Sequence, residues 1–269
     1  MHALIEILRP ANCLMAAVAS MVGMISASGL LGLDPRTALL VTAVVFLVTG
    51  GGNVVNDYFD RDIDAVNRPS RPVPSGRISP VLALRWSFLL FLLGSALALM
   101  INPLCLALAA ANSLLLVAYA GYLKATPLAG NLTVAYLTGS TFLFGGLATG
   151  SYSEITAVLS ILAGLATLGR EIVKDVEDVD GDRAGGARTL PILFGPALSS
   201  RAAAAAVLCG VALSYLAPLG RPYLVAVTAA NILFLASVRK ALQGEPSASQ
   251  RFLKLGMALA LVAFTIGSL

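Results

Sequence analysis

The sequence predicts an all-α membrane protein in which about nine transmembrane helices form one bundle. Three observations support this fold class. Of the 269 residues, 58% are hydrophobic and only 12% are charged, and the apolar residues form long runs separated by charges, prolines and Gly, Asn and Ser clusters. Because soluble domains average about 25% charged residues, an ordinary soluble protein is excluded.

The apolar runs predict the individual helices. A helix that crosses a membrane needs roughly 20 mostly apolar residues. The chain offers such runs at residues 11–33, 36–56, 80–101, 103–121, 127–150, 154–171, 197–217, 222–239 and 252–269. The connections at 102–103 and 219–222 are so short that the helices they join must be antiparallel neighbours. The sequence therefore predicts one transmembrane domain over residues 1–269, in which glycines 50–52 and 145–146 let helices approach closely.

The distribution of cations predicts the orientation. Lys and Arg favour the cytoplasmic side of a membrane. If the N-terminus lies inside, all 18 Lys and Arg residues except Arg36 and Arg221 fall on that side. We therefore expect a multi-pass protein of the cell membrane with its N-terminus inside and its C-terminus outside. The net charge of +4 does not indicate a nucleic-acid partner, because the cations lie at the ends of apolar runs rather than in a stripe with interleaved aromatics.

The acidic residues are concentrated in two short segments. Of the 14 acids, four lie within residues 57–64 and six within residues 171–182. In each segment three aspartates recur at positions i, i+3 and i+7, which places them along one face of a helix at the inner end of a span. They are Asp57, Asp60 and Asp64 in the first motif and Asp175, Asp178 and Asp182 in the second. The repeated spacing on one predicted side favours a shared site over two solvated loops.

This layout indicates a bound cation, because carboxylates at helical spacing repel one another. Oxygen ligands favour Mg²⁺ or Ca²⁺, and neither segment has the alternating ligands and final Glu of an EF-hand. Mg²⁺ is usually held by one or two carboxylates together with phosphate oxygens, which suits two acidic faces that converge on a diphosphate. Five nearby cations could neutralise the remaining phosphate charge: Arg68, Arg71, Lys124, Lys174 and Arg188.

Both acidic segments resemble signatures of a known family. Asn56-Asp57-x-x-Asp60-x-x-x-Asp64, followed by Asn-Arg-Pro-x-Arg-Pro-x-Pro-Ser-Gly at residues 67–76, resembles the first signature of the UbiA-type intramembrane prenyltransferases. Residues 169–182, with residues 186–191 after them, resemble the second signature, most closely in the archaeal branch that makes ether lipids. The resemblance implies helices around a central cavity. Its cytoplasmic end would be closed by the two motifs, in loops 57–79 and 171–196, with Mg²⁺ as the cofactor that bridges them to a prenyl diphosphate.

The resemblance also implies a role for each motif residue. Asn56, Asp60 and Asp64 would bind one metal ion, and Asp178 and Asp182 the other. Asp57 and Asp175 would be supporting ligands. The implied diphosphate-binding residues are Tyr119 and Lys124, which resemble the family's Tyr/Lys element, together with Arg68, Arg71, Lys174 and Arg188. Lys124 is also counted with the catalytic residues, because stabilising the departing diphosphate lets the allylic C–O bond ionise.

The resemblance implies the two substrates as well. The donor would be geranylgeranyl diphosphate, and the acceptor the free hydroxyl of 3-O-geranylgeranylglyceryl phosphate, a lipid-like glycerol phosphate reached from the membrane. A phosphorylated acceptor needs an anion site of its own, for which Arg9, Asn12 and Arg170 are candidates. Arg9 and Arg170 could equally be interfacial anchors, and Asn12 could equally make an ordinary interhelical hydrogen bond.

Three alternatives remain open from the sequence. An aromatic acceptor, such as a quinone or chlorophyll precursor, would keep the fold and the metal site. A CDP-alcohol phosphotransferase would need one compact Asp-rich signature with two further aspartates downstream, but no acid follows Asp182 before Glu245. A cation transporter would favour ionisable residues near the bilayer midplane, whereas nearly all charges here lie at the ends of the spans.

Overall fold

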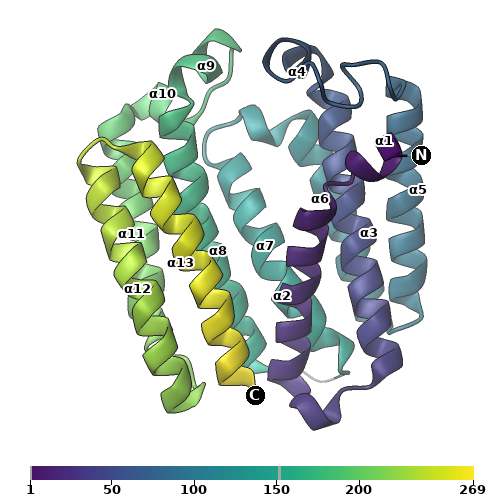
Figure 1. Cartoon of the computed structure of the whole chain (residues 1–269), viewed down its shortest axis with the longest axis vertical. Coiled ribbons are helices and arrows are strands. Elements are labelled where there is room, and N and C mark those ends of the chain that lie inside the picture. The colour runs from purple at the N-terminus through teal and green to yellow at the C-terminus, as the bar shows by residue number, and fades with distance from the viewer. Residues whose placement is uncertain (1, 151–152) are drawn as a thin grey trace.

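The computed structural model describes residues 2–150 and 153–269, and these residues form helices joined by short loops (Figure 1). The helices are α1 (His2–Glu6), α2 (Pro10–Ser28), α3 (Pro35–Phe59), α4 (Arg61–Asn67), α5 (Pro80–Leu99), α6 (Pro103–Gly121), α7 (Ala129–Ala148), α8 (Glu154–Glu177), α9 (Val179–Ala184), α10 (Leu190–Phe194), α11 (Pro196–Ser214), α12 (Gly220–Leu242) and α13 (Pro246–Ser268). Two 3₁₀ turns, η1 (Leu30–Gly32) and η2 (Leu123–Ala125), lie in connections.

Local sequence sets where the long helices begin. Proline occupies the first turn of α2, α3, α5, α6, α11 and α13, where its missing N–H needs no partner and its fixed φ suits a helix. Side chains cap three of these helices. Asp34 accepts from the Thr37 backbone N–H at 2.9 Å, and Asn102 accepts from the Cys105 N–H at 2.8 Å. Ser79 caps α5 in the same way.

Among the described residues, eight helices are long and apolar enough to cross a membrane. They are α2, α3, α5, α6, α8, α11, α12 and α13. The predicted span at 127–150 corresponds to α7, which has 20 residues but does not meet this hydropathy criterion. Its buried positions include Asn131, Thr133, Gly139, Ser140 and Gly145. These small and polar residues lower its hydropathy. They suit α7 because this helix packs against other helices, mainly α2 and α8.

The long helices run between two ends of the bundle (Figure 1). The short helices α4, α9 and α10 lie at one end, at the top of Figure 1, and we call it the motif end because both Asp motifs reach it. One apolar cluster joins α8, α11, α12 and α13, and another joins α2, α3, α5, α6 and α7. Large apolar side chains such as Leu92, Leu114 and Val225 are exposed on the outward faces of their helices, as expected where lipid replaces water.

Glycines bring α7 into backbone contact with its neighbours. A Cβ on Gly145 would overlap the carbonyl oxygen of Ser20 in α2, and a Cβ on Gly23 would overlap the carbonyl oxygen of Phe142 in α7. The expected close approach at residues 145–146 is therefore confirmed. Gly51 and Gly52 serve a different purpose, since they make room for the side chains of Phe91 and Leu116.

The structure corrects the expectation that each Asp motif follows a single helix face. α3 ends at Phe59 and α4 starts at Arg61, so the helix breaks at Asp60. α8 ends at Glu177 and α9 starts at Val179, so the second break falls at Asp178. The first aspartate of each motif thus belongs to a long helix rather than to a loop, and the third belongs to a short helix. The middle aspartate of each motif thus forms the corner between a long and a short helix.

Candidate active site

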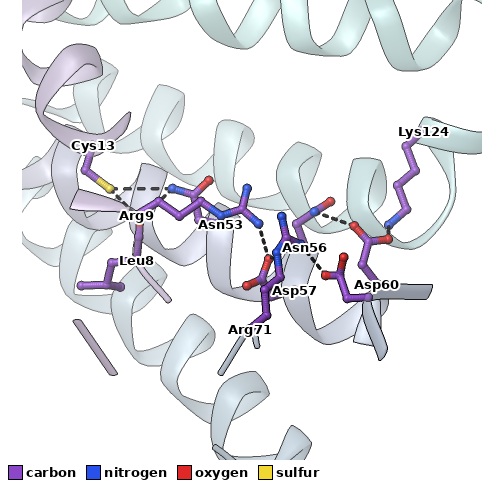
Figure 2. A network of polar contacts seen from close by, with 10 residues as sticks. Leu8, Arg9, Cys13, Asn53, Asn56, Asp57, Asp60, Arg71 and Lys124 are labelled. Carbon is purple, nitrogen blue, oxygen red and sulfur yellow. Dashed lines mark hydrogen bonds and ion pairs between the residues drawn. The ribbon is translucent and has the colours of Figure 1, made fainter. Parts of the chain in front are cut away.

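The first Asp motif lies in a network of protein cations (Figure 2). Asp57 is 2% exposed and pairs with Arg9 and, at 3.3 Å, with Arg71. Arg71 also pairs with the buried carboxylate of Asp64, so one guanidinium joins the end of α3 to α4. Burying these acids requires the cations, because an unpaired buried carboxylate is costly.

Asp60 lies at the corner between the two helices and has different partners. Its Oδ2 accepts a hydrogen bond from the Asn56 side-chain amide at 2.7 Å, and its Oδ1 pairs with Lys124. Lys124 comes from η2, the turn between α6 and α7. Figure 2 shows the Asn56 amide and the Lys124 amine reaching the two oxygens of this carboxylate from different elements. The structure therefore brings together Asn56, Asp60 and Lys124, three of the residues predicted to act in catalysis.

The second Asp motif has fewer protein partners. Asp175 accepts from the Asn131 side-chain amide of α7 at 2.7 Å. Asp178 is exposed, and no ion pair to it is found in the described part of the chain. Burial raises the pKa of the Asp182 carboxyl, and the nearby Asp178 carboxylate raises it further. Among the described residues, no ion pair to the second motif corresponds to those that Arg9, Arg71 and Lys124 make with the first, and Lys174 is the cation that favours the charged form of Asp182.

An electrostatic interaction and a hydrogen bond relate the motifs to each other. Tyr119 of α6 lies within electrostatic range of Asp60 in the first motif and of Asp175 in the second. The backbone N–H of Arg188, after α9, donates to the carbonyl oxygen of Ala125 at 3.0 Å. The second motif's loop is therefore tied to the turn that carries Lys124.

Below the motif end lies a pocket of about 950 Å³. Its lining comes from α3, α6, α7, α8, α11, α12 and α13 and from Arg9 and the first turns of α2. Five of the predicted site residues on these helices line it: Asn12, Asn56, Tyr119, Arg170 and Lys174. Most other lining residues are apolar, such as Val48, Leu116 and Phe264. A charged end and an apolar interior suit an amphipathic substrate with a long hydrocarbon chain.

The remaining predicted cations lie in different environments. Arg68 and Arg188 are exposed near the motifs, and neither lines the pocket. Arg170 pairs with the buried carboxylate of Glu171, and Lys174 approaches the same carboxylate at 3.9 Å. Arg9 adopts a left-handed backbone conformation with φ of 52°, which costs about 1–2 kcal/mol outside glycine. The ion pair to Asp57 holds the Arg9 side chain at the pocket's edge.

The donor set fits a hard divalent cation. Within residues 2–150 and 153–269, no three His, Cys, Asp or Glu side chains already stand in a metal-binding arrangement. The two motifs nevertheless offer only carboxylate and amide oxygens, which Mg²⁺ prefers to nitrogen or sulfur ligands. The assignment of individual metal ligands stays a prediction.

Four polar residues of this region were not assigned a role from the sequence. Asn53 donates to the Leu8 carbonyl oxygen at 2.7 Å and so fixes the connection between α1 and α2 against α3. Asn131 supports Asp175, Glu171 holds Arg170, and Lys254 of α13 lines the pocket. A polar side chain inside or near an apolar run is the signal that could have singled them out.

Comparison with known proteins defines the class to which this fold and site belong. Residues 15–262 match the model of the UbiA prenyltransferase family. The chain therefore belongs to the UbiA prenyltransferase family, and it is an integral membrane prenyltransferase. This assignment sets aside the CDP-alcohol phosphotransferase and transporter alternatives.

Particular relatives narrow the comparison. The chain is 57% identical to the digeranylgeranylglyceryl phosphate synthase of Methanothrix thermoacetophila over 98% of both chains. It is 47% identical to the enzyme of the same name from Methanopyrus kandleri, again over 98% of both chains. A solved structure from work on digeranylgeranylglyceryl phosphate synthase in membranes superimposes with a TM-score of 0.87 at 38% identity, covering 99% of this chain and 98% of that one. A UbiA homologue from Archaeoglobus fulgidus, bound to GPP and Mg²⁺, shares the fold with a TM-score of 0.72 at 19% identity, covering 96% of this chain and 99% of that one.

Proposed function

We propose that this chain is a digeranylgeranylglyceryl phosphate synthase. It transfers the geranylgeranyl group of geranylgeranyl diphosphate to the free hydroxyl of 3-O-geranylgeranylglyceryl phosphate, which forms the second ether bond of archaeal membrane lipids and releases diphosphate. The observation that carries the proposal is the 57% identity to an enzyme of that name over nearly the whole of both chains.

The motif end receives the donor's diphosphate in this proposal. Asn56, Asp60 and Asp64 hold one Mg²⁺, Asp178 and Asp182 hold a second, and Asp57 and Asp175 support them. The Mg²⁺ bound to the Archaeoglobus fulgidus homologue supports the choice of metal. Bound Mg²⁺ supplies positive charge that stabilises the departing diphosphate.

The chain's own cations contribute to the same step. Lys124, which already reaches the site from η2, binds the diphosphate oxygens, and Tyr119 meets the diphosphate from the pocket that it lines. Further positive charge comes from Arg68, Arg71, Lys174 and Arg188. Stabilising the leaving group in this way lowers the barrier to ionisation of the allylic C–O bond.

The apolar pocket shields the allylic cation from water in this proposal. It holds the isoprenoid chain and excludes water, which would otherwise capture the allylic cation before the acceptor hydroxyl does. The motif end faces the cytoplasm in this proposal. The orientation is supported by the positive-inside rule, under which the side with few cations is the outer one. Arg36 and Arg221, the two cations predicted to lie outside, are at the starts of α3 and α12, at the end of the bundle opposite the motifs.

The test is an assay in reconstituted membranes. Geranylgeranyl diphosphate and Mg²⁺ are supplied with geranylgeranylglyceryl phosphate and 4-hydroxybenzoate together, and diphosphate release and product mass are followed. We expect a doubly prenylated glycerol phosphate whose formation stops when EDTA removes Mg²⁺. Prenylation of 4-hydroxybenzoate alone would move the function to quinone synthesis and refute the proposed acceptor.

A further inference from the structure

Lys254 of α13 is a cation of the pocket that neither Asp motif includes. It lines the pocket and is exposed, and among the described residues no carboxylate forms an ion pair with it. A lysine at the end of a membrane helix is often only an interfacial anchor. Its position relative to α8 distinguishes it from such an anchor.

The register between α8 and α13 is fixed by hydrogen bonds at the motif end. Glu177, the last residue of α8, accepts from the Gln250 side-chain amide at 2.7 Å and from the Ser247 hydroxyl. The two helices are antiparallel, because α8 ends and α13 begins at the motif end (Figure 1). Both therefore extend from this contact toward the opposite end of the bundle. One turn of helix, about 5.4 Å, separates Gln250 from Lys254 and Glu177 from the level of Lys174. Lys254 therefore lies near the level of Lys174, about one turn of helix from the level of Arg170, and all three line the same pocket.

The charge at this level of the pocket is positive. Among the residues of α8 and α13 that line the pocket, Arg170, Lys174 and Lys254 are cations and Glu171 is an acid, whereas Asp175 and Glu177 of α8 do not line it. Glu171 pairs with Arg170 and lies 3.9 Å from Lys174. The Arg170 Nε is buried and has no hydrogen-bond partner in the described structure, so a donor is left over. A phosphate monoester carries close to two negative charges near neutral pH and offers three acceptor oxygens.

Of these three cations, Lys254 lies apart from the proposed diphosphate site, whereas Lys174 is shared with it. A diphosphate held between the two Asp motifs contacts α3, α4, η2, α8 and α9, whereas Lys254 belongs to α13. The neighbours of Lys254 on α13 that line the pocket are the apolar residues Met257, Ala258 and Leu261. An anionic headgroup at Lys254 would thus have its hydrocarbon chain directly beside it.

We propose that Lys254, together with Arg170, binds the phosphate monoester of the acceptor lipid and selects a phosphorylated acceptor over its alcohol. This inference rests on the proposed function for the identity of the acceptor. Glu171 positions Arg170, and Lys174 lies between the acceptor's phosphate and the second Asp motif.

The test compares Lys254→Gln and Lys254→Arg with Arg251→Gln as the matched control. Arg251 is an exposed cation on the same helix, less than one turn away, and it does not line the pocket. At saturating donor we expect Lys254→Gln to raise the KM for geranylgeranylglyceryl phosphate about tenfold, the low end of the range for a charged hydrogen bond because the lysine is exposed. Lys254→Arg and Arg251→Gln should stay within about twofold of wild type, as should the donor KM in every variant.

A binding measurement separates this inference from the proposed function. Calorimetry in detergent without donor compares geranylgeranylglyceryl phosphate, geranylgeranylglycerol and a phosphodiester lipid. We expect wild type to bind the monoester most tightly and Lys254→Gln to abolish this preference. If none of the three lipids is prenylated in the activity assay but the preference for binding the monoester depends on Lys254, the proposed function fails and the anion site stands. An equal loss for all three lipids, or the same loss in Arg251→Gln, would identify Lys254 as an interfacial anchor and overturn the inference.

Discussion

Because α2 and α7 meet backbone to backbone, Gly145 has the least room for an added methyl group among the glycines of the described residues. In Gly145→Ala the new Cβ would overlap the Ser20 carbonyl oxygen and lie 2.8 Å from the Met24 nitrogen. Ordinary contacts between non-bonded heavy atoms lie at about 3.5–4.0 Å. Both neighbours are backbone atoms, so no side chain can rotate away. The two helices must therefore separate by roughly 2 Å along this contact.

The cost follows from overpacking. Extra methylenes in a well-packed interior cost about 1–3 kcal/mol, and a backbone clash belongs at the upper end of that range. Replacing Gly by Ala inside a helix returns at most about 1 kcal/mol. We therefore expect a net loss of about 2 kcal/mol for Gly145→Ala.

Gly164→Ala is the matched control, because its Cβ would meet the Ala135 carbonyl oxygen at 3.4 Å, an ordinary contact. Both variants change a glycine in a long helix against a neighbouring backbone carbonyl. Unfolding of the purified proteins in one detergent should show a lower midpoint for Gly145→Ala and an unchanged or higher midpoint for Gly164→Ala. Equal midpoints for the two variants would refute the claim that α2 and α7 meet backbone to backbone.

Four further predictions concern the motif end. Asp60→Ala and Asp178→Ala should each lower turnover at least about 100-fold while the unfolding midpoint stays near that of wild type; wild-type turnover in either would refute the metal-ligand assignment. Asn131→Ala removes the donor to Asp175 and should raise the Mg²⁺ concentration for half-maximal diphosphate release roughly tenfold, whereas an unchanged Mg²⁺ titration would show that Asp175 needs no support. Arg71→Gln leaves the buried Asp57 and Asp64 with less compensation and should cost about 2–4 kcal/mol of stability, while the exposed Arg68→Gln should cost almost nothing; equal stabilities would contradict the bridging role. The Arg77 hydrogen bond lowers the pKa of Glu6, so the stabilisation from this hydrogen bond is present above the unfolded pKa of about 4.3 and is lost as the pH falls through the lower folded value. Glu6→Gln should remove this part of the acid sensitivity, and parallel pH–stability curves for the variant and the wild type would argue against the contribution of Glu6.

The sequence contained enough information to place the long helices and the acidic motifs. Prolines and capping residues mark helix starts locally, so α5 and α6 begin at the predicted residues 80 and 103. The last helix begins earlier than predicted, at Pro246 rather than residue 252, because polar residues such as Ser249 and Gln250 pack against α12 and α8 instead of ending the helix. Hydropathy alone does not show that neighbouring helices provide hydrogen-bond partners for such residues.

The helix breaks at Asp60 and Asp178 could not be read from spacing. A 3,4 pattern of aspartates fits a continuous helix as well as a broken one. What decides between them is tertiary: Arg71 pulls Asp64 toward Asp57, and Lys124 holds Asp60 at the corner. Lys124 is 64 residues from Asp60, and the spacing of the aspartates does not show which of the nearby arginines pairs with Asp64, so the ion pairs of the first motif appear only when the fold is known.

Tertiary contacts also explain the low hydropathy of α7 and the lack of a predicted role for Lys254. Hydropathy measures how well a helix suits lipid, whereas α7 suits other helices: Gly139 and Gly145 admit backbone atoms, and Asn131 binds a carboxylate of α8. Low hydropathy in a helix of spanning length is therefore a consequence of a central position in the bundle. Lys254 acquires a role only through the register that Glu177 and Gln250 set between two helices about 70 residues apart in the chain. Contacts of this kind, rather than the Asp motifs that the family shares, are where members of one fold can differ in the acceptor they bind.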